Sequence, residues 1–301
     1  MANYCTLYNK KKCLSKIRSG NFTALISRSR NAIIKNIMYK LSDEISDNHC
    51  HTEIAYCAED VTMRGAMEKA TACGLYSIAF TEHYLHFYLA KEQCWSDIIY
   101  RNPGLLRKNR NRGARRLEQY RSDFRGLNSN RALLGLELDL DYRGKLLLLP
   151  EDRNGWDLLI GAVHNLPPEI LTGTDQERNK RFLRDSELLL ENGVDILAHP
   201  LRFFQRGKLP EPKAIFRPLV RMLKEYRVPA EINFHTNEPE PEFFRLCLEE
   251  GVKLSFGTDS HNMTEVANMD RHLEFLKQIG VTNPKDVLWR KKDVTRKKNI
   301  T

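Results

Sequence analysis

The chain has 301 residues, 41% of them hydrophobic, and a formal net charge of +9. This length is long for a single β-sandwich and usual for one α/β barrel, with enough apolar side chains to fill its core. No apolar run approaches the roughly 18 residues of a membrane span, and no short apolar secretory segment is recognisable. Seven cysteines without regular spacing argue against a disulfide framework, so we expect a soluble cytoplasmic protein.

The positive charge is concentrated at the two ends of the chain. Residues 1–42 contain nine Lys or Arg and no acidic residue, and residues 285–301 carry +5. The residues between them therefore carry −5. Because the basicity belongs to the ends, the overall charge does not indicate a barrel surface that binds polyanions. We predict three parts: a basic extension over 1–44, a barrel over 45–284 and a basic tail over 285–301.

The first part of the chain is predicted to form an amphipathic basic helix. Its apolar residues recur at helical spacing, with Arg28, Arg30, Lys35 and Lys40 elsewhere on the helical wheel. We interpret it as a helix that packs its apolar stripe on the barrel. A membrane-surface anchor, a contact with an acidic partner and an organelle-targeting segment are the alternatives. The apolar stripe consists of Phe22, Leu25, Ile26, Ile33, Ile34, Ile37, Met38 and Leu41.

Most histidines of the chain directly follow apolar runs. His49 and His51 lie one residue apart after a short predicted strand, so both rings lie on one side of it and can reach one metal ion. The other histidines of this kind are His83, His164, His199, His235 and His261, whereas His86 and His272 are interpreted as solvated or packed side chains. The apolar runs are predicted to be buried strands over 75–80, 132–138, 156–163, 194–198, 228–234 and 252–256.

Helices are predicted between these strands. Asp60 is a plausible N-cap and Gly74 a plausible C-terminal cap of the first. With the strand before His49, seven strands alternate with helices, which predicts parallel pairing, right-handed crossovers and a barrel of seven strands. Polar ligands at the carboxyl ends of such strands occupy one face of the barrel. The other helices are predicted over 113–127, 175–192, 215–226, 240–250 and 265–279.

The region from Lys91 to Arg125 is rich in arginine. Some of these side chains could line the rim of an active site and hold a substrate phosphate, because the guanidinium matches phosphate geometry. For most of them we expect a long insertion with solvated charges, since exposed arginine is common. Aromatic residues of the kind that stack nucleic-acid bases are few here, namely Trp95, Tyr100 and Tyr120.

Six phrases of the sequence, in order, resemble the polymerase and histidinol phosphatase (PHP) superfamily of metal-dependent phosphoesterases. They are DNHCHT, TEH, GLELD (Gly135–Asp139), IGAVH (Ile160–His164), AHP and GTDSH (Gly257–His261). The resemblance spans residues 45–265, and the histidinol-phosphatase-like members are most similar because no polymerase segment is present. It implies a distorted (β/α)7 barrel with two or three divalent metal ions at the carboxyl ends of the strands.

The resemblance also implies a ligand set and the groups that support it. Imidazoles suit Zn, Fe or Mn, and carboxylates can bridge two cations. Asp47 and Glu82 are expected to orient the imidazoles by accepting their other N–H. The implied metal ligands are His49, His51, His83, Glu137, His164, His199, Asp259 and His261.

Cys57 departs from the family pattern, which commonly has His or Asp six residues after the second histidine of the first phrase. A thiolate binds Zn or Fe well and Mn or Mg poorly. Three interpretations follow. Cys57 is a ligand and favours softer metals, Glu59 replaces it, or one metal position is weakened. An ordinary buried cysteine is the structural alternative.

Arg202, three residues after His199, is the best candidate for binding a phosphate, and His235 is expected to contact substrate or to support a ligand. Glu231 is expected to have a structural hydrogen-bonding role. The expected reaction is hydrolysis of a small phosphomonoester by a metal-bound water. The alternatives are a nuclease acting on short nucleic acids with the same centre, and a non-catalytic protein that binds metal and ligand. The pattern leaves the ester, the metal and the oligomeric state open.

Overall fold

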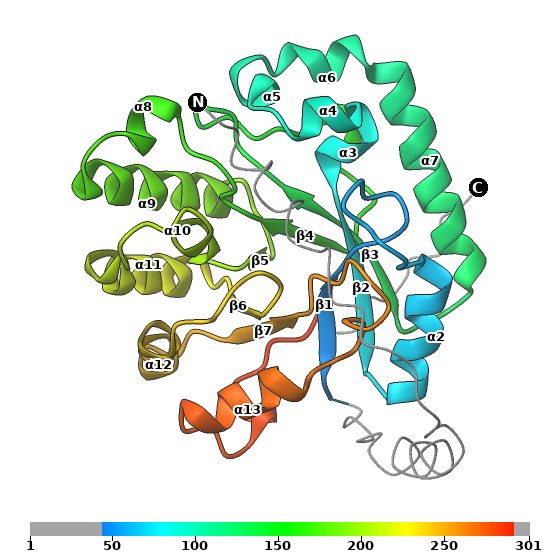
Figure 1. Ribbon diagram of the computed structural model, residues 1–301. Helices are drawn as coiled ribbons and strands as arrows, with labels where there is room; N and C mark the ends of the chain where they lie inside the picture. Colours follow the sequence, from blue (N-terminus) through cyan, green and yellow to red (C-terminus); the bar gives the residue numbers. More distant parts are fainter. Residues whose placement is uncertain (1–43, 292–301) are drawn as a thin grey trace, which may run out of the picture.

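Seven parallel strands form a nearly closed barrel, as expected from the sequence. The structure is a computed structural model and describes residues 44–291. The strands pair in chain order, each with the next, and helices surround them (Figure 1). They are β1 Ser46–Cys50, β2 Ser77–His83, β3 Ala132–Leu138, β4 Leu158–Gly161, β5 Ile196–Leu197, β6 Ala230–Asn233 and β7 Leu254–Gly257.

The barrel closes where the first strand meets the segment that follows the last. Cys50 and Ser260 form a parallel bridge, and the Asp259 amide donates to the His49 carbonyl at 2.6 Å. The His51 amide donates in turn to the Ser260 carbonyl at 3.2 Å. The backbone of the predicted ligand phrases therefore forms the seam of the barrel.

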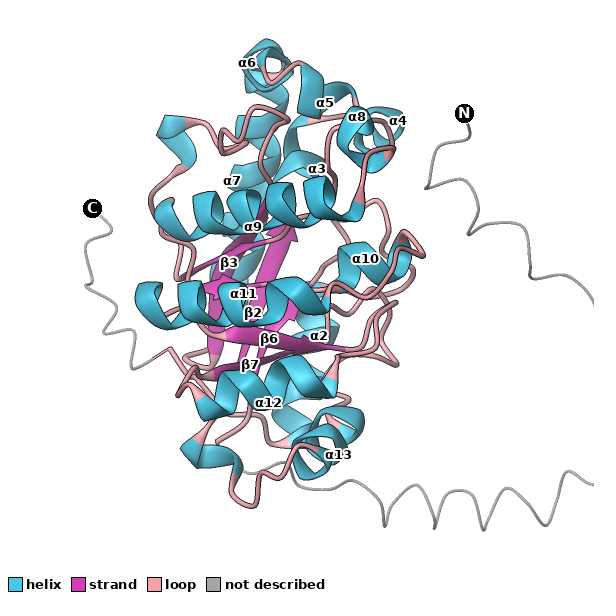
Figure 2. Ribbon diagram, turned by 90° about the vertical axis from the view of Figure 1, so that its left-hand side faces the viewer, coloured by secondary structure: helices cyan, strands magenta, loops and turns pink. Residues whose placement is uncertain are grey.

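Six longer helices cover the outside of the strands. α9, α11 and α12 lie in a row over one side of the barrel (Figure 2). No helix of the described residues is both long enough and apolar enough to cross a membrane. The longer helices are α2 Met63–Cys73, α7 Arg110–Leu127, α9 Asp175–Glu191, α11 Lys213–Tyr226, α12 Pro241–Glu249 and α13 Asp270–Gln278.

The arginine-rich region forms an insertion of short helices after β2, which ends in α7. These helices gather beyond the carboxyl ends of β2 and β3 (Figure 1). Arg112 and Arg116 do not point into solvent. They donate to the Tyr56 hydroxyl at 2.5 Å and to the Ile54 carbonyl at 3.1 Å, so they hold the loop between β1 and α2. The short helices are α3 Tyr84–Tyr88, α4 Lys91–Cys94, α5 Ile98–Arg101 and α6 Gly104–Lys108, and elsewhere α8 Pro168–Leu171 and α10 Arg202–Arg206.

Two predicted helix starts are wrong for identifiable reasons. α2 is capped by Thr62, whose hydroxyl accepts from the Gly65 amide, whereas Asp60 accepts from the Met263 amide at 2.7 Å in another loop. α13 begins at Asp270 rather than at Glu265, because the Glu265 carboxylate accepts from the His261 amide and Ala267 has a positive φ of 55°.

Strand alternation divides the barrel interior into an apolar floor and a polar mouth. In β3, Leu133, Gly135 and Glu137 share one face because successive side chains point to opposite sides. Leu133 belongs to an interior apolar cluster against which Trp289 packs. Glu137 lies on the same face, four residues after Leu133 and nearer the carboxyl end of β3. The rest of this cluster is Ala79, Leu158, Ile160, Ala162, Ile196 and Ala198.

The residues after α13 also contact the barrel. The Trp289 amide donates to the Leu254 carbonyl at 2.7 Å, and Lys291 pairs with Asp195 at 2.8 Å. The predicted basic helix over residues 22–41 and the last ten residues of the predicted tail lie outside the described residues.

Candidate metal centre

Glu137 is the central residue of the polar mouth. Its Oε1 lies 3.0 Å from His199 Nε2 and 3.3 Å from His164 Nε2. Its Oε2 lies 2.6 Å from His83 Nδ1, 3.7 Å from His49 Nε2 and 3.8 Å from His51 Nε2. One buried carboxylate thus touches or approaches five imidazoles from β1, β2 and the segments after β4 and β5.

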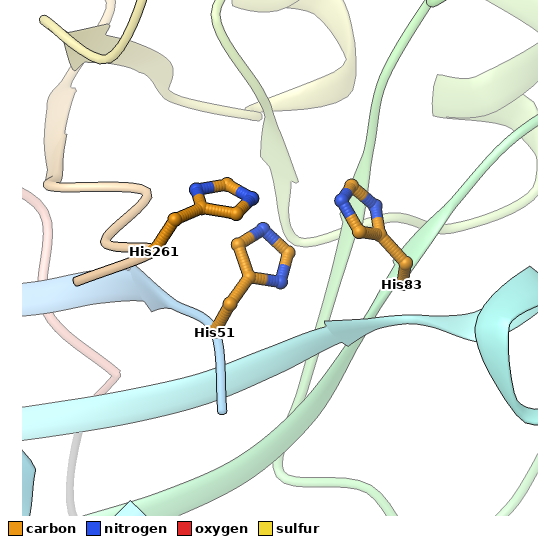
Figure 3. Close-up of side chains that lie close together, drawn as sticks. All are labelled: His51, His83 and His261. Atoms are coloured by element: carbon orange, nitrogen blue, oxygen red, sulfur yellow. The ribbon is translucent and has the colours of Figure 1, made fainter. Parts of the chain in front are cut away.

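Asp259 and His261 complete the pocket from the segment after β7. Asp259 Oδ1 lies 2.9 Å from His51 Nε2 and 3.6 Å from His49 Nε2. The rings of His51, His83 and His261 turn toward one another (Figure 3), with ring centres 4.2 Å apart for His51 and His83 and 4.5 Å apart for His51 and His261. The structure therefore brings together all eight ligands that the resemblance implied.

Four buried polar atoms in this pocket have no hydrogen-bond partner among the described residues. They are His49 Nε2, His51 Nε2, Glu137 Oε2 and Asp259 Oδ1. The close approaches among them, such as that of His51 Nε2 and Asp259 Oδ1, lack hydrogen-bond direction. Buried polar groups are normally satisfied, so four unsatisfied atoms aimed at one region fit the binding of a cation. Imidazole nitrogens and carboxylate oxygens are ligands that suit Zn, Fe and Mn.

Carboxylates behind the pocket hold the other ring nitrogens. Glu231 Oε1 lies 2.9 Å from His49 Nδ1, Glu82 Oε1 lies 3.0 Å from His51 Nδ1, and Asp139 Oδ1 lies 2.7 Å from His164 Nδ1. Such contacts place the proton on Nδ1 and leave the Nε2 lone pair free for a cation. Sequence reasoning anticipated this arrangement for Glu82, predicted a structural hydrogen-bonding role for Glu231 without naming its partner, and missed Asp139.

Asp47 does not orient an imidazole, contrary to expectation. Its carboxylate accepts from the Thr258 amide at 3.0 Å and from the Thr258 hydroxyl at 2.6 Å. It therefore fastens the seam between β1 and the segment after β7. Burial outweighs these hydrogen bonds and raises the Asp47 pKa to about 6.

Comparison with known proteins agrees with this geometry. The PHP domain family matches residues 47–235, well over half of the chain. The chain belongs to the PHP family. It is 30% identical over 166 residues to a Clostridium novyi protein named "Probable phosphatase", in an alignment covering 52% of this chain and 62% of that protein. A protein of the same name from Acetivibrio thermocellus is 29% identical over 159 residues, with coverages of 50% and 61%. The PHP chain thus spans about three fifths of the length of these relatives.

A solved PHP-type structure shares the fold. The crystal structure described as "putative histidinol phosphatase hisK" of Listeria monocytogenes superimposes with a TM-score of 0.50 at 16% identity. The match covers 74% of this chain and 97% of that one. At this identity the similarity supports the barrel architecture alone.

Arg202 lies inside the PHP pocket and not at its rim. It is only 4% exposed, and its guanidinium contacts Asp259 Oδ2, His164 Nε2 at 3.1 Å and His199 Nε2 at 2.6 Å. A cation held by Glu137, His164 and His199 would need the same lone pairs, so binding there requires the guanidinium to turn away.

His235 and Cys57 are half-buried residues beside the pocket. The His235 ring stacks on His261 with centres 4.3 Å apart, and its Nδ1 is 3.3 Å from Glu265 Oε1. Cys57 falls in a grouping of candidate ligands with His83 and His86. Glu59, the alternative to Cys57, is exposed and belongs to none of the groupings within residues 44–291.

Two features of the backbone aim side chains into the PHP pocket. Ile196 and Ala198 line the interior, so strict alternation would turn His199 outward, but its φ of +30° redirects the ring to Glu137. Asp259 likewise has a φ of +52°. Such conformations cost about 1–3 kcal/mol for most residues other than glycine, although Asp and His adopt them more readily than most.

The pocket concentrates negative charge. Burial opposes ionisation of Glu82, but His51 outweighs it and lowers the Glu82 pKa to about 2. Burial also disfavours protonated imidazole, yet Glu82 and Asp259 raise the His51 pKa to about 9. Asp139 and Glu137 do the same for His164, whose pKa also rises to about 9. These carboxylates therefore attract positive charge, which protons or metal cations can supply.

Proposed function

We propose that this PHP chain is a metal-dependent phosphoesterase that hydrolyses a small phosphomonoester. The single observation that carries the proposal is the set of four unsatisfied, buried ligand atoms of His49, His51, Glu137 and Asp259. Bound cations would supply an activated water and offset the charge that develops on the transferred phosphoryl group. The names of the two curated relatives support the same activity.

The chain's own residues have distinct proposed roles in this reaction. Glu137 lies among His49, His51, His164 and His199, and these five side chains would together hold the cations. Arg202 can donate two N–H groups to phosphate oxygens once it turns from His164 and His199. His235, whose ring stacks on that of His261, can contact the leaving group.

The substrate is proposed as a compact ester with one phosphate, and histidinol phosphate is one candidate. The name of the Listeria monocytogenes structure suggests that ester for that protein. The body of this chain is acidic, which disfavours long polyanions and supports a small substrate.

The test is turnover of an aryl phosphomonoester before and after chelation, with Zn, Fe and Mn added back separately. We expect activity to vanish on chelation and to return with at least one metal, and His51→Ala to lose at least about 100-fold in kcat/KM, because it removes a ligand. Lys213→Ala, an exposed change outside the pocket, is the matched control.

Three results would contradict the proposal. Turnover that survives chelation would remove the metal mechanism. Hydrolysis of short oligonucleotides with negligible turnover of monoesters would identify a nuclease, and its salt dependence would be steep. Stoichiometric binding of metal and phosphate without turnover would identify a non-catalytic protein.

A further inference from the structure

The two carboxylates inside the pocket each divide their oxygens between two sets of neighbours. Glu137 Oε2 lies 3.7 Å from His49 Nε2 and 3.8 Å from His51 Nε2. Asp259 Oδ1 approaches the same two nitrogens at 3.6 and 2.9 Å. These four atoms have no hydrogen-bond partner within residues 44–291. The other oxygens, Glu137 Oε1 and Asp259 Oδ2, face a second set of residues and have partners there.

Arg202 supplies the positive charge of the second set. Its Nη1 donates to Asp259 Oδ2, and its Nη2 lies 2.6 Å from His199 Nε2 and 3.1 Å from His164 Nε2. The same two ring nitrogens lie 3.0 and 3.3 Å from Glu137 Oε1. One guanidinium therefore stands among the carboxylate and imidazole atoms that a metal cation would need at this position.

The fold builds Arg202 into the interior. Its amide donates to the His199 carbonyl at 3.0 Å, in the turn that joins β5 to α10. Phe204 anchors α10, because its buried ring packs edge-on against Phe182 of α9 with ring centres 4.9 Å apart. Arg202 itself is also buried. Release of the position therefore requires a movement of the Arg202 side chain and not of the helix that carries it.

Movement of the guanidinium would leave charges without partners. Asp259 would lose its ion-pair partner, and Arg202 would carry an unpaired charge in a buried pocket. Breaking a buried ion pair in this way is strongly unfavourable. A metal cation in the vacated position would satisfy Asp259 and the two imidazoles, while an anion would satisfy the displaced guanidinium. Each ligand therefore offsets part of the cost of binding the other.

We propose that Arg202 is an internal counter-cation, which holds the position among Glu137, His164 and His199 until a divalent metal cation and a phosphate anion displace it together. The positions formed by the unsatisfied atoms fill first, and the position that Arg202 holds fills last. This inference rests on the proposed function, because the anion is the phosphate group of substrate or product. By thermodynamic linkage, phosphate and the last cation strengthen each other's binding by the same factor.

This role differs from phosphate binding alone. A side chain that only binds phosphate would, when removed, weaken phosphate binding and leave the affinity for metal unchanged in the absence of phosphate. An internal counter-cation competes with the metal, so its removal should strengthen binding of the last cation. The direction of the change in metal affinity therefore separates the two roles.

The test is a Zn²⁺ binding isotherm of the full-length, chelator-treated protein, measured by dialysis against metal buffers followed by metal analysis. Without phosphate, the last cation should require free Zn²⁺ at least about tenfold higher than the cations before it. Inorganic phosphate should lower that requirement at least about fivefold, because it pairs with the displaced guanidinium. Both measurements use the unaltered protein, so they are independent of any effect of a substitution on folding.

Two substitutions separate the contacts of Arg202 from its charge. Arg202→Met removes both, and should strengthen binding of the last cation at least about tenfold without phosphate. Arg202→Lys keeps the charge but loses the planar fork that reaches three acceptors, so it should give a smaller gain in the same direction, at least about threefold. Arg271→Met is the matched control, since it removes the same charge from an exposed ion pair with Glu238, and it should leave the isotherm unchanged.

Isotherms of both Arg202 variants that match that of the unaltered protein, or shift to higher Zn²⁺, would overturn this inference. An absent phosphate effect, or one of equal size in the unaltered protein and in Arg202→Met, would also overturn it, because the guanidinium would then not carry the coupling. Each of these results is compatible with metal-dependent turnover and leaves the proposed function standing. A failure of the unaltered protein to bind Zn²⁺ would overturn both.

Discussion

At the scale of single residues, the pocket is organised by histidine rings whose two nitrogens have different surroundings. Each of His49, His51 and His164 has a carboxylate on Nδ1 and directs Nε2 inward. Glu231 serves two elements at once, because its second oxygen accepts from the His199 amide at 2.7 Å. It thereby also holds the strained backbone of His199 in place.

We predict that Glu231→Gln weakens metal binding by about 10- to 100-fold, since the support of a ligand is lost while the ligand remains. The amide can still hydrogen-bond, but it no longer stabilises the polarised imidazole of His49. Competition with a chromophoric chelator would measure the affinity. Glu242→Gln, an exposed change in α12, should leave it unaltered, and an equal affinity for both variants would refute the role of Glu231.

At the scale of elements, the pocket depends on close contact between strands β1, β6 and β7. A Cβ atom on Gly257 would lie 1.9 Å from Glu231 Oε1 and 2.6 Å from His49 Cβ. β7 therefore requires glycine at position 257. Any side chain there would collide with Glu231 and His49 and break the contact by which Glu231 orients the His49 ring.

We predict that Gly257→Ala destabilises the protein by about 3 kcal/mol or more, through overpacking in a region that cannot relax. Gly126→Ala is the comparison, because nothing lies within 4 Å of its added methyl group in α7, and we expect it to stabilise by about 0.5 kcal/mol. Urea unfolding of both variants gives the difference. Equal stabilities would show that β7 can move away from β1.

α13 carries a buried histidine that makes stability depend on pH. Burial lowers the His272 pKa to about 4, and its Nε2 lies 3.1 Å from the Gly257 carbonyl. The unfolded chain, with a pKa of 6.5, binds the proton more readily, so stability falls as the pH drops from 6.5 toward 4.

We predict that His272→Gln removes about 2 kcal/mol of the stability lost between pH 7.5 and pH 5. Gln retains a donor for the Gly257 carbonyl and does not titrate. Urea unfolding of the unaltered protein and of His272→Gln at both pH values provides the measurement. Both proteins are treated with chelator first, so that loss of metal at low pH does not contribute to the difference. Parallel pH dependence in the two proteins would exclude His272 as the source.

At the scale of the whole molecule, the sequence predicts the order of the strands better than their extents. Apolar runs identify six of the seven strands, and the first was predicted from the short run before His49. β5, however, is two residues long where five were predicted. Two aspartates account for part of the difference in strand length. The Asp157 and Asp195 carboxylates accept from the Leu134 and Leu159 amides, so a side chain takes the place of a backbone partner before β4 and β5 begin.

The candidate ligands could be named in advance because the six phrases that resemble the PHP family contain them, and because most of the histidines directly follow apolar runs. The supporting residues could not. Whether a carboxylate such as Asp139 or Glu231 meets an imidazole depends on which face of its strand it occupies and on the strand beside it. For His86 the sequence left open a solvated or a packed side chain, and the structure shows it packed, because the insertion folds back over β2.

Removal of bound cations should lower the stability of the entire barrel. A cation at 100 times its dissociation constant stabilises the folded state by about 2.7 kcal/mol, or about 5–10 °C in melting temperature for a domain of this size. We predict such a loss on chelation, measured by thermal unfolding. The melting temperature of Asp259→Asn should fall less on chelation. An unchanged melting temperature in the unaltered protein would mean that the cations do not bind the folded barrel tightly.

The seam between β1 and the segment after β7 has a consequence for synthesis of the protein. His49 and Asp259 are joined through their own backbones, yet they lie about two hundred positions apart in the chain. A nascent chain on the ribosome holds the first histidines long before their last partners have emerged. The centre is therefore assembled only when the final strand is released, and a polypeptide that stops before β7 would have most of the ligands and no enclosed site.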